Sequence, residues 1–225
     1  PLIVHIADLE DLSEITENVP PETELLAKHF WPGPLTMIFE KSSLVPYGTT
    51  GGLDTVAVRM PSDLIARKLI LAAGGYVSAP SANTSGRPSP TTAEHVWEDL
   101  NGKIEMIIDG GSVDIGLEST ILDMTVFPPM ILRPGAITAD MLEEVIGVVS
   151  VDETILGSES SQAPKAPGMK YRHYAPKADL AIVEGPEEAV VKKINELAAE
   201  AKAHGEQVGI CLLYTSPSPR DYAAS

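Results

Sequence analysis

The chain has 225 residues, of which 44% are hydrophobic, and its 32 acidic and 16 basic residues give a net charge of −16. This length allows one large or two modest domains with a real hydrophobic core. The acidic charge repels phosphate backbones over most of the surface, which disfavours broad nucleic-acid binding, while a local pair of arginines can still hold one nucleotide.

The remaining bulk features concern cellular location. The single cysteine, Cys211, excludes an intrachain disulfide. The sequence has no run of about 18 apolar residues, and its first residues lack the basic start of a signal peptide. These features predict a cytoplasmic protein without a membrane partner.

Strand-like and helix-like segments alternate along residues 1–150, which predicts an α/β fold. In chain order, strands are expected at residues 2–6, 35–39, 55–58, 76–79, 106–108, 119–122 and 130–132. Helices are expected at residues 8–16, 21–29 and 63–73, then from Thr91 or Thr92 to near Gly102, and at 138–147. Ser62 is expected to cap the third of these helices.

The composition changes after residue 150. Residues 151–177 are rich in Ser, Pro, Lys and Gly, which predicts an interdomain linker after a first domain of residues 1–150. A strand at 180–183, a helix at 186–204 and a strand at 208–213 would form one βαβ unit, the start of a small Rossmann-like domain at 178–213. The Ser/Pro-rich residues 214–225 are a candidate non-native tail.

Several common site signatures are missing from the sequence. It has no Walker-type phosphate loop, no G-x-G-x-x-G after a strand, no G-x-S-x-G elbow and no H-E-x-x-H motif. The five histidines are scattered, so no metal site built from protein side chains is expected. Mg²⁺ arriving with a nucleotide remains the expected metal.

The segment from Ser78 to Thr91 (SAPSANTSGRPSPT) lies between a predicted strand and a predicted helix N-terminus. At that edge of an α/β sheet, free backbone N–H groups suit an anion. Serine, asparagine, glycine and proline are also the usual residues of turns, so an ordinary loop is an equal alternative.

Two arginines follow apolar strands. Arg59 ends the strand at 55–58, and Arg133 ends the strand at 130–132. A guanidinium at a strand end can bind a carboxylate or phosphate with two hydrogen bonds, although a structural ion pair is an alternative. His5, inside an apolar strand, is more typical of a core residue than of a catalyst. Ser119 begins another predicted strand, and by itself it does not indicate a function.

Taken together, these segments resemble the YrdC-like family of threonylcarbamoyl-adenylate synthases. The matching sequence segments are residues 1–5, HFWPGPLT at 29–36, TVAVRMP at 55–61, SAPSANTSGRPSPT at 78–91, GLEST at 116–120 and ILRPG at 131–135. The linker sequence APGMKYRHYAP at 166–176 resembles the two-domain long form. In that family an N-terminal segment with a Lys/Arg pair that faces the phosphates would precede Pro1.

The resemblance implies a twisted mixed sheet with helices around a large concave site. It also implies a nucleotidyltransferase that makes threonylcarbamoyl-AMP and pyrophosphate from L-threonine, bicarbonate and ATP, with Mg²⁺ accompanying the ATP. The product would pass to a downstream threonylcarbamoyl transferase complex that forms N6-threonylcarbamoyladenosine at tRNA position 37. Direct tRNA binding is not expected because of the acidic charge.

The resemblance also assigns residues by motif. It implies that threonine is held by His5, Arg59, Ala79 and Ser119. ATP would be held by Thr55, Ser81, Ser89, Arg133 and Tyr174. The basic cluster at 170–174 would close over the triphosphate as a lid, with simple linker solubility as the alternative. No side chain is assigned as catalytic, because the reaction needs positioning and charge neutralisation more than a protein nucleophile.

Two other functions remain open. One is a non-catalytic RNA-binding module on the same fold, against which the net charge weighs. The other is a carbamoyl-transfer domain of the hydrogenase-maturation type, against which the KYRHYAP linker weighs.

Overall fold

The computed structural model describes residues 1–156 and 179–210. The chain divides into two compact units, Pro1–Ala175 and Pro176–Ser225. Tyr174, most of the expected linker, the basic cluster at 170–174 and the candidate tail lie outside the described residues. No helix in the described residues is long and apolar enough to cross a bilayer.

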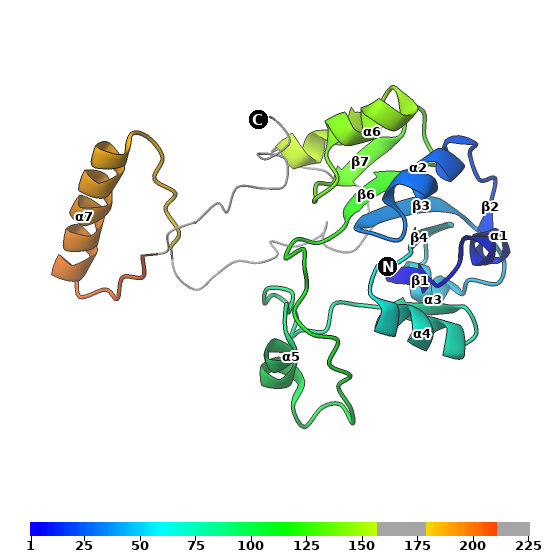
Figure 1. Ribbon diagram of the computed structural model, residues 1–225, viewed down its shortest axis with the longest axis horizontal. Helices are drawn as coiled ribbons and strands as arrows, with labels where there is room; N and C mark the ends of the chain where they lie inside the picture. Colours follow the sequence, from blue (N-terminus) through cyan, green and yellow to red (C-terminus); the bar gives the residue numbers. More distant parts are fainter. Residues whose placement is uncertain (157–178, 211–225) are drawn as a thin grey trace. The chain divides into compact units, whose positions relative to one another are not determined.

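Within the described residues, the first unit contains an eight-stranded mixed sheet (Figure 1). Its strands are β1 (Ile3–Ile6), β2 (Thr16–Glu17), β3 (Leu35–Lys41), β4 (Thr55–Arg59), β5 (Tyr76–Ala79), β6 (Thr120–Asp123), β7 (Met130–Arg133) and β8 (Ser150–Val151). The order is β5-β1-β4-β3-β6-β7-β8, with β2 paired to β3. The pairs β1–β4, β3–β6 and β7–β8 are parallel and the other pairs are antiparallel.

The helices of this unit connect or flank the strands. They are η1 (Leu9–Asp11), α1 (Leu12–Ile15), α2 (Glu22–Phe30), α3 (Tyr47–Thr50), α4 (Leu64–Ala72), α5 (Ala93–Leu100), α6 (Ala139–Ile146) and η2 (Glu153–Leu156). Side chains of Thr92 and Thr138 cap α5 and α6. The cap of α4 is Asp63, whose carboxylate accepts from the Ala66 N–H at 2.7 Å, so the prediction of Ser62 was wrong.

Side chains alternate along the strands, and in β3, β4 and β6 both faces of the sheet are buried. On one face, Val56 and Val58 of β4 join a large core that includes Leu26 of α2 and Leu142 of α6. On the other face, a smaller apolar cluster contains Ile38, Ala57, Ile121 and Leu132. Because side chains alternate, Thr55 and Arg59 share the second face with Ala57. This second face therefore carries the polar residues on which the site depends.

The α/β fold and most elements of residues 1–150 confirm the sequence predictions, with local corrections. The helix expected at 8–16 is divided into η1 and α1, and α1 ends at Ile15 because Thr16 turns extended and pairs with Lys41 of β3. The Thr16 hydroxyl closes the last turn of α1 by donating to the Leu12 carbonyl at 2.7 Å. Four short elements, β2, α3, β8 and η2, were not predicted, and η2 lies where the linker was expected to begin.

The strand expected at 106–108 is wrong. These residues are irregular, and Met106 and Ile108 are 75% and 55% exposed. An apolar run becomes a strand only when a neighbouring strand accepts its backbone hydrogen bonds. No described residue provides that partner strand.

The second unit was predicted correctly only in its helix. The described helix α7 (Glu187–Ala203) confirms the expectation for 186–204. The strand expected at 180–183 is wrong, and residues 208–210 of the other expected strand are also not in a strand. Two isolated segments cannot form a sheet without pairing, and the described part of this unit shows no such pairing.

Candidate functional site

Four predicted site residues lie at one edge of the sheet: His5, Arg59, Ser119 and Arg133. His5 of β1 is the register partner of Arg59 at the end of the parallel strand β4. The strand β3 is antiparallel to β4 and begins at this edge, and β6 begins beside it with Thr120 opposite Leu35. The ends of β1 and β4 therefore lie at the same edge as the starts of β3 and β6.

Arg59 is anchored to the turn before β3. Its Nε donates to the Gly33 carbonyl at 3.0 Å, and the Gly33 N–H donates to the Met60 carbonyl at 2.9 Å. A Cβ on Gly33 would lie 2.4 Å from the Phe30 carbonyl oxygen, so only glycine fits this close approach. The WPGP turn thus fixes the guanidinium of Arg59 at the sheet edge.

Arg133 is held beside Ser119, at the start of β6. Its Nε and Nη2 donate to the Ser119 carbonyl at 3.1 and 2.9 Å, and Nη2 also donates to the Ser119 Oγ at 3.1 Å. Ser119 is 4% exposed. The two arginines are near enough for the charge of Arg133, after the larger effect of burial, to lower the pKa of Arg59. Two neighbouring cations at this edge favour an anionic ligand there.

His5 is neutral at physiological pH. Burial and then the nearby charge of Arg59 lower its pKa from 6.5 to about 4, against a smaller opposite effect from backbone hydrogen bonds with Val77 and Ile3. A neutral imidazole adds no third positive charge at this edge. It can therefore hydrogen-bond a ligand while the arginines balance the ligand's negative charge.

Gly135 allows the segment after β7 to pack closely against the segment before β6. A Cβ there would lie 2.5 Å from the Glu118 carbonyl oxygen and 2.6 Å from the Thr120 nitrogen, both of them backbone atoms. This contact keeps Arg133 within reach of Ser119.

We expect Gly135→Ala to lower the free energy of unfolding by about 1–3 kcal/mol, because backbone atoms must move apart to admit the methyl group. Urea denaturation measures the loss. Gly48→Ala is the matched control, since a Cβ on Gly48 meets nothing within 4 Å. Equal stability of Gly135→Ala and the parent chain would contradict the packing described above.

The loop after β5 is organised from α5. The carboxylate of Asp99, which is 9% exposed, accepts from the Thr84 N–H at 2.9 Å and forms an ion pair with Arg87. Asn83 spans the same turn, donating to the carbonyls of Thr84 and Arg87 at 3.1 and 2.8 Å. This internal bonding makes Arg87 a structural residue of the loop.

The predicted ATP-binding serines lie on this loop. Ser81 is exposed and Ser89 is partly buried. Unlike His5 and Arg59, neither is placed at the sheet edge by strand register.

Thr55 and Ala79 lie farther along the same face of the sheet. Ala79 is the register partner of Ile3, two residues before His5, and Thr55 precedes Arg59 by four residues on β4. At about 3.3 Å per strand residue, Thr55 and Arg59 are about 13 Å apart. At this distance Thr55 and Arg59 belong to two neighbouring subsites on the same face. The predicted site residues therefore do not all surround a single position.

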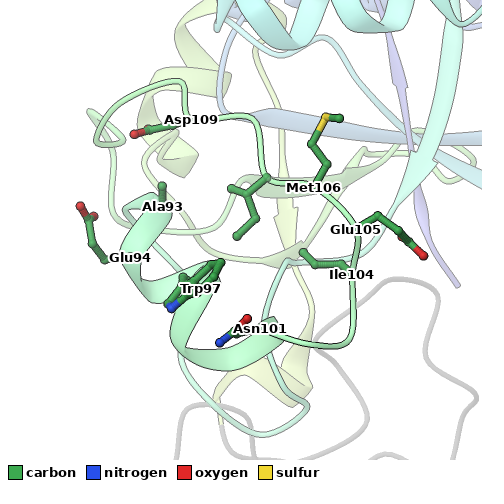
Figure 2. A pocket seen from close by; sticks show the side chains of 9 residues that line it. Ala93, Glu94, Trp97, Asn101, Ile104, Glu105, Met106 and Asp109 are labelled. Carbon is green, nitrogen blue, oxygen red and sulfur yellow. The ribbon is translucent and has the colours of Figure 1, made fainter.

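A pocket of about 420 Å³ lies elsewhere, between α5 and the following residues 101–109. Figure 2 shows Trp97 on the helix, and Ile104 and Met106 on the segment that follows it. It contains no predicted site residue. We therefore base the site on the hydrogen-bonded sheet edge, which gathers the charged groups.

Sequence reasoning assigned no role to Thr36. Its Oγ1 lies 2.7 Å from the Ser119 Oγ, and the side chain is fully buried. The HFWPGPLT text contains this residue, but the contact joins residues 83 positions apart and becomes visible only in the fold.

The fold and the strand ends define an α/β protein with two neighbouring arginines at one edge of its sheet. The Sua5/YciO/YrdC family model, described as telomere recombination, matches residues 1–135. A second model, described as the threonylcarbamoyl-AMP synthase C-terminal domain, matches residues 137–224. The chain belongs to the Sua5/YciO/YrdC family, which confirms the resemblance found in the sequence.

Two relatives named threonylcarbamoyl-AMP synthase are similar over most of the chain. The protein from Pyrococcus abyssi is 54% identical over 93% of this chain and 62% of its own length. The protein from Bacillus subtilis is 47% identical over 93% of this chain and 59% of its own length. This chain therefore spans about three fifths of each relative.

A solved structure shows the same fold. The P. abyssi Sua5 structure, complexed with L-threonine, matches with a TM-score of 0.88 and 54% identity over 94% of this chain and 62% of that chain.

Proposed function

We propose that the protein is a threonylcarbamoyl-AMP synthase, which forms threonylcarbamoyl-AMP and pyrophosphate from L-threonine, bicarbonate and ATP. The observation that carries this proposal is the pair Arg59 and Arg133, which end β4 and β7 at the same edge of the sheet, with the charge of Arg133 lowering the pKa of Arg59. The substrates together bring a carboxylate and a triphosphate, and two guanidinium groups match these anions. The structure of the P. abyssi relative with L-threonine supports the same proposal.

The chemistry divides into two steps. The amine of threonine attacks the carbon of bicarbonate, forming an N–C bond and releasing water, and the carbamate results. A carbamate oxygen then attacks the α-phosphorus of ATP, and the bond to pyrophosphate breaks. Both steps depend on placing anions close together, which arginines favour by neutralising charge.

The site residues divide between the two substrates. Arg59 binds the threonine carboxylate, and His5, Ala79 and Ser119 surround the rest of the amino acid. Arg133 binds the nucleotide. Thr55, Ser81, Ser89 and Tyr174 complete the ATP subsite, and Mg²⁺ enters bound to the triphosphate. His5, as a neutral imidazole, hydrogen-bonds the substrate and does not compete with Arg59 for the threonine carboxylate.

The domains have separate parts in this proposal. Residues 1–156, which include β8 and η2, form the catalytic domain, the following residues to 177 form a linker that closes over ATP, and residues 178–213 begin a C-terminal domain. The product passes, in the cytoplasm, to a transferase complex that modifies tRNA. The net charge of −16 favours transfer of a small molecule over direct tRNA binding by this protein.

The test is pyrophosphate release from ATP by the natural full-length protein. Release is expected to require both threonine and bicarbonate, because the carbamate is the nucleophile. Equal rates with and without these two substrates would refute the proposal. Salt-dependent RNA binding without pyrophosphate release would favour an RNA-binding module, and activity with carbamoyl phosphate in place of threonine would favour carbamoyl transfer.

A further inference from the structure

Thr36 lies on β3, between Ile121 of β6 and the position of Arg59 on β4, on the same face of the sheet. Its side chain is fully buried, and its Oγ1 is 2.7 Å from the Oγ of Ser119. Arg133 Nη2 lies 3.1 Å from the same Ser119 oxygen and can only donate to it. The Ser119 hydroxyl therefore lies between the Thr36 hydroxyl and the Arg133 guanidinium, and the guanidinium is a donor.

The direction of the bond between the hydroxyls follows from what each proton can reach. Among the described residues, Ser119 Oγ is the hydrogen-bond partner shown for Thr36 Oγ1. If Ser119 donated to Thr36, the proton of the fully buried Thr36 would have no acceptor in the described structure, which is costly. If Thr36 donates, both lone pairs of Ser119 Oγ are filled and only its proton remains available.

We infer that Thr36 is a positioning residue, which donates to Ser119 and thereby turns the Ser119 hydroxyl into a fixed donor toward an acceptor oxygen of bound threonine. This inference rests on the proposed function. Thr36 itself does not touch the substrate. Its effect is on the orientation of Ser119, which keeps an exposure of 4%, whereas Thr36 has none.

The test compares Thr36→Val with Thr36→Ser in the natural full-length protein, with pyrophosphate release as the assay. Thr36→Val keeps the shape but loses the donor, and we expect it to raise the threonine KM about three- to tenfold. The ATP KM and kcat should change little. Thr36→Ser keeps a hydroxyl and is expected to restore the threonine KM.

Thr50→Val is the matched control. Thr50 is 1% exposed and donates to the Leu53 carbonyl at 2.7 Å. Thr50→Val therefore removes a comparable buried hydrogen bond outside the site. It should lower the melting temperature without changing the threonine KM. An unchanged threonine KM in Thr36→Val, an equal rise in Thr36→Ser, or an equal rise in Thr50→Val would overturn the inference. An inactive parent protein would instead refute the proposed function, and the inference with it.

Discussion

Arg59→Ala is expected to weaken the use of threonine by about 2–5 kcal/mol, or about 30- to 5,000-fold in the threonine KM. The guanidinium is partly buried and held by the Gly33 carbonyl, so it presents its remaining donors in a fixed direction. Removing it leaves the threonine carboxylate in a partly desolvated place without a counter-charge. Steady-state pyrophosphate release at varied threonine measures the change.

The ATP KM of Arg59→Ala should stay near that of the parent, because Arg133 remains. Arg67→Ala is the matched control. Arg67 also bonds a backbone carbonyl, that of Ala7, through Nε and Nη2 at 3.1 and 2.8 Å, but it lies on α4 outside the proposed site. It is expected to lower stability and leave the threonine KM unchanged. An unaltered threonine KM in Arg59→Ala would remove Arg59 from the site.

The fold of residues 1–150 could be predicted well because its signals are local. β1, β4 and α2 are specified by apolar patterning and by turn residues close to them in sequence. The errors occur where distant parts of the chain decide. Residues 106–108 have a strand-like composition without a described partner strand, and Thr16 leaves its helix because β3 offers hydrogen bonds.

The candidate site could be predicted only in part, for the same reason. The positions of Arg59 and Arg133 at strand ends are visible in the sequence. Their approach to each other depends on the order of the strands, because β3 and β6 lie between β4 and β7. The contact of Thr36 with Ser119 likewise arises from the parallel pairing of β3 and β6.

His5 should make the protein less stable in mild acid. The unfolded chain binds a proton at His5 near pH 6.5, whereas the folded protein does so only near pH 4, because burial and Arg59 lower the pKa. Between these values the unfolded state holds the extra proton, so this contribution to stability is complete above pH 6.5 and is lost as pH falls toward 4. The shift corresponds to about 3 kcal/mol.

Urea denaturation of the parent chain and of His5→Gln, at several pH values from 4 to 7, isolates this contribution, since all other titrating groups are shared. Glutamine keeps hydrogen-bonding capacity and cannot be protonated in this range. The stability advantage of the parent at pH 7 is therefore expected to shrink by about 3 kcal/mol at pH 4. His95→Gln makes the same substitution at an exposed position on α5 and tests for effects of histidine loss unrelated to burial. A difference between parent and His5→Gln that stays constant over this range would show that His5 is not buried as a neutral imidazole beside Arg59.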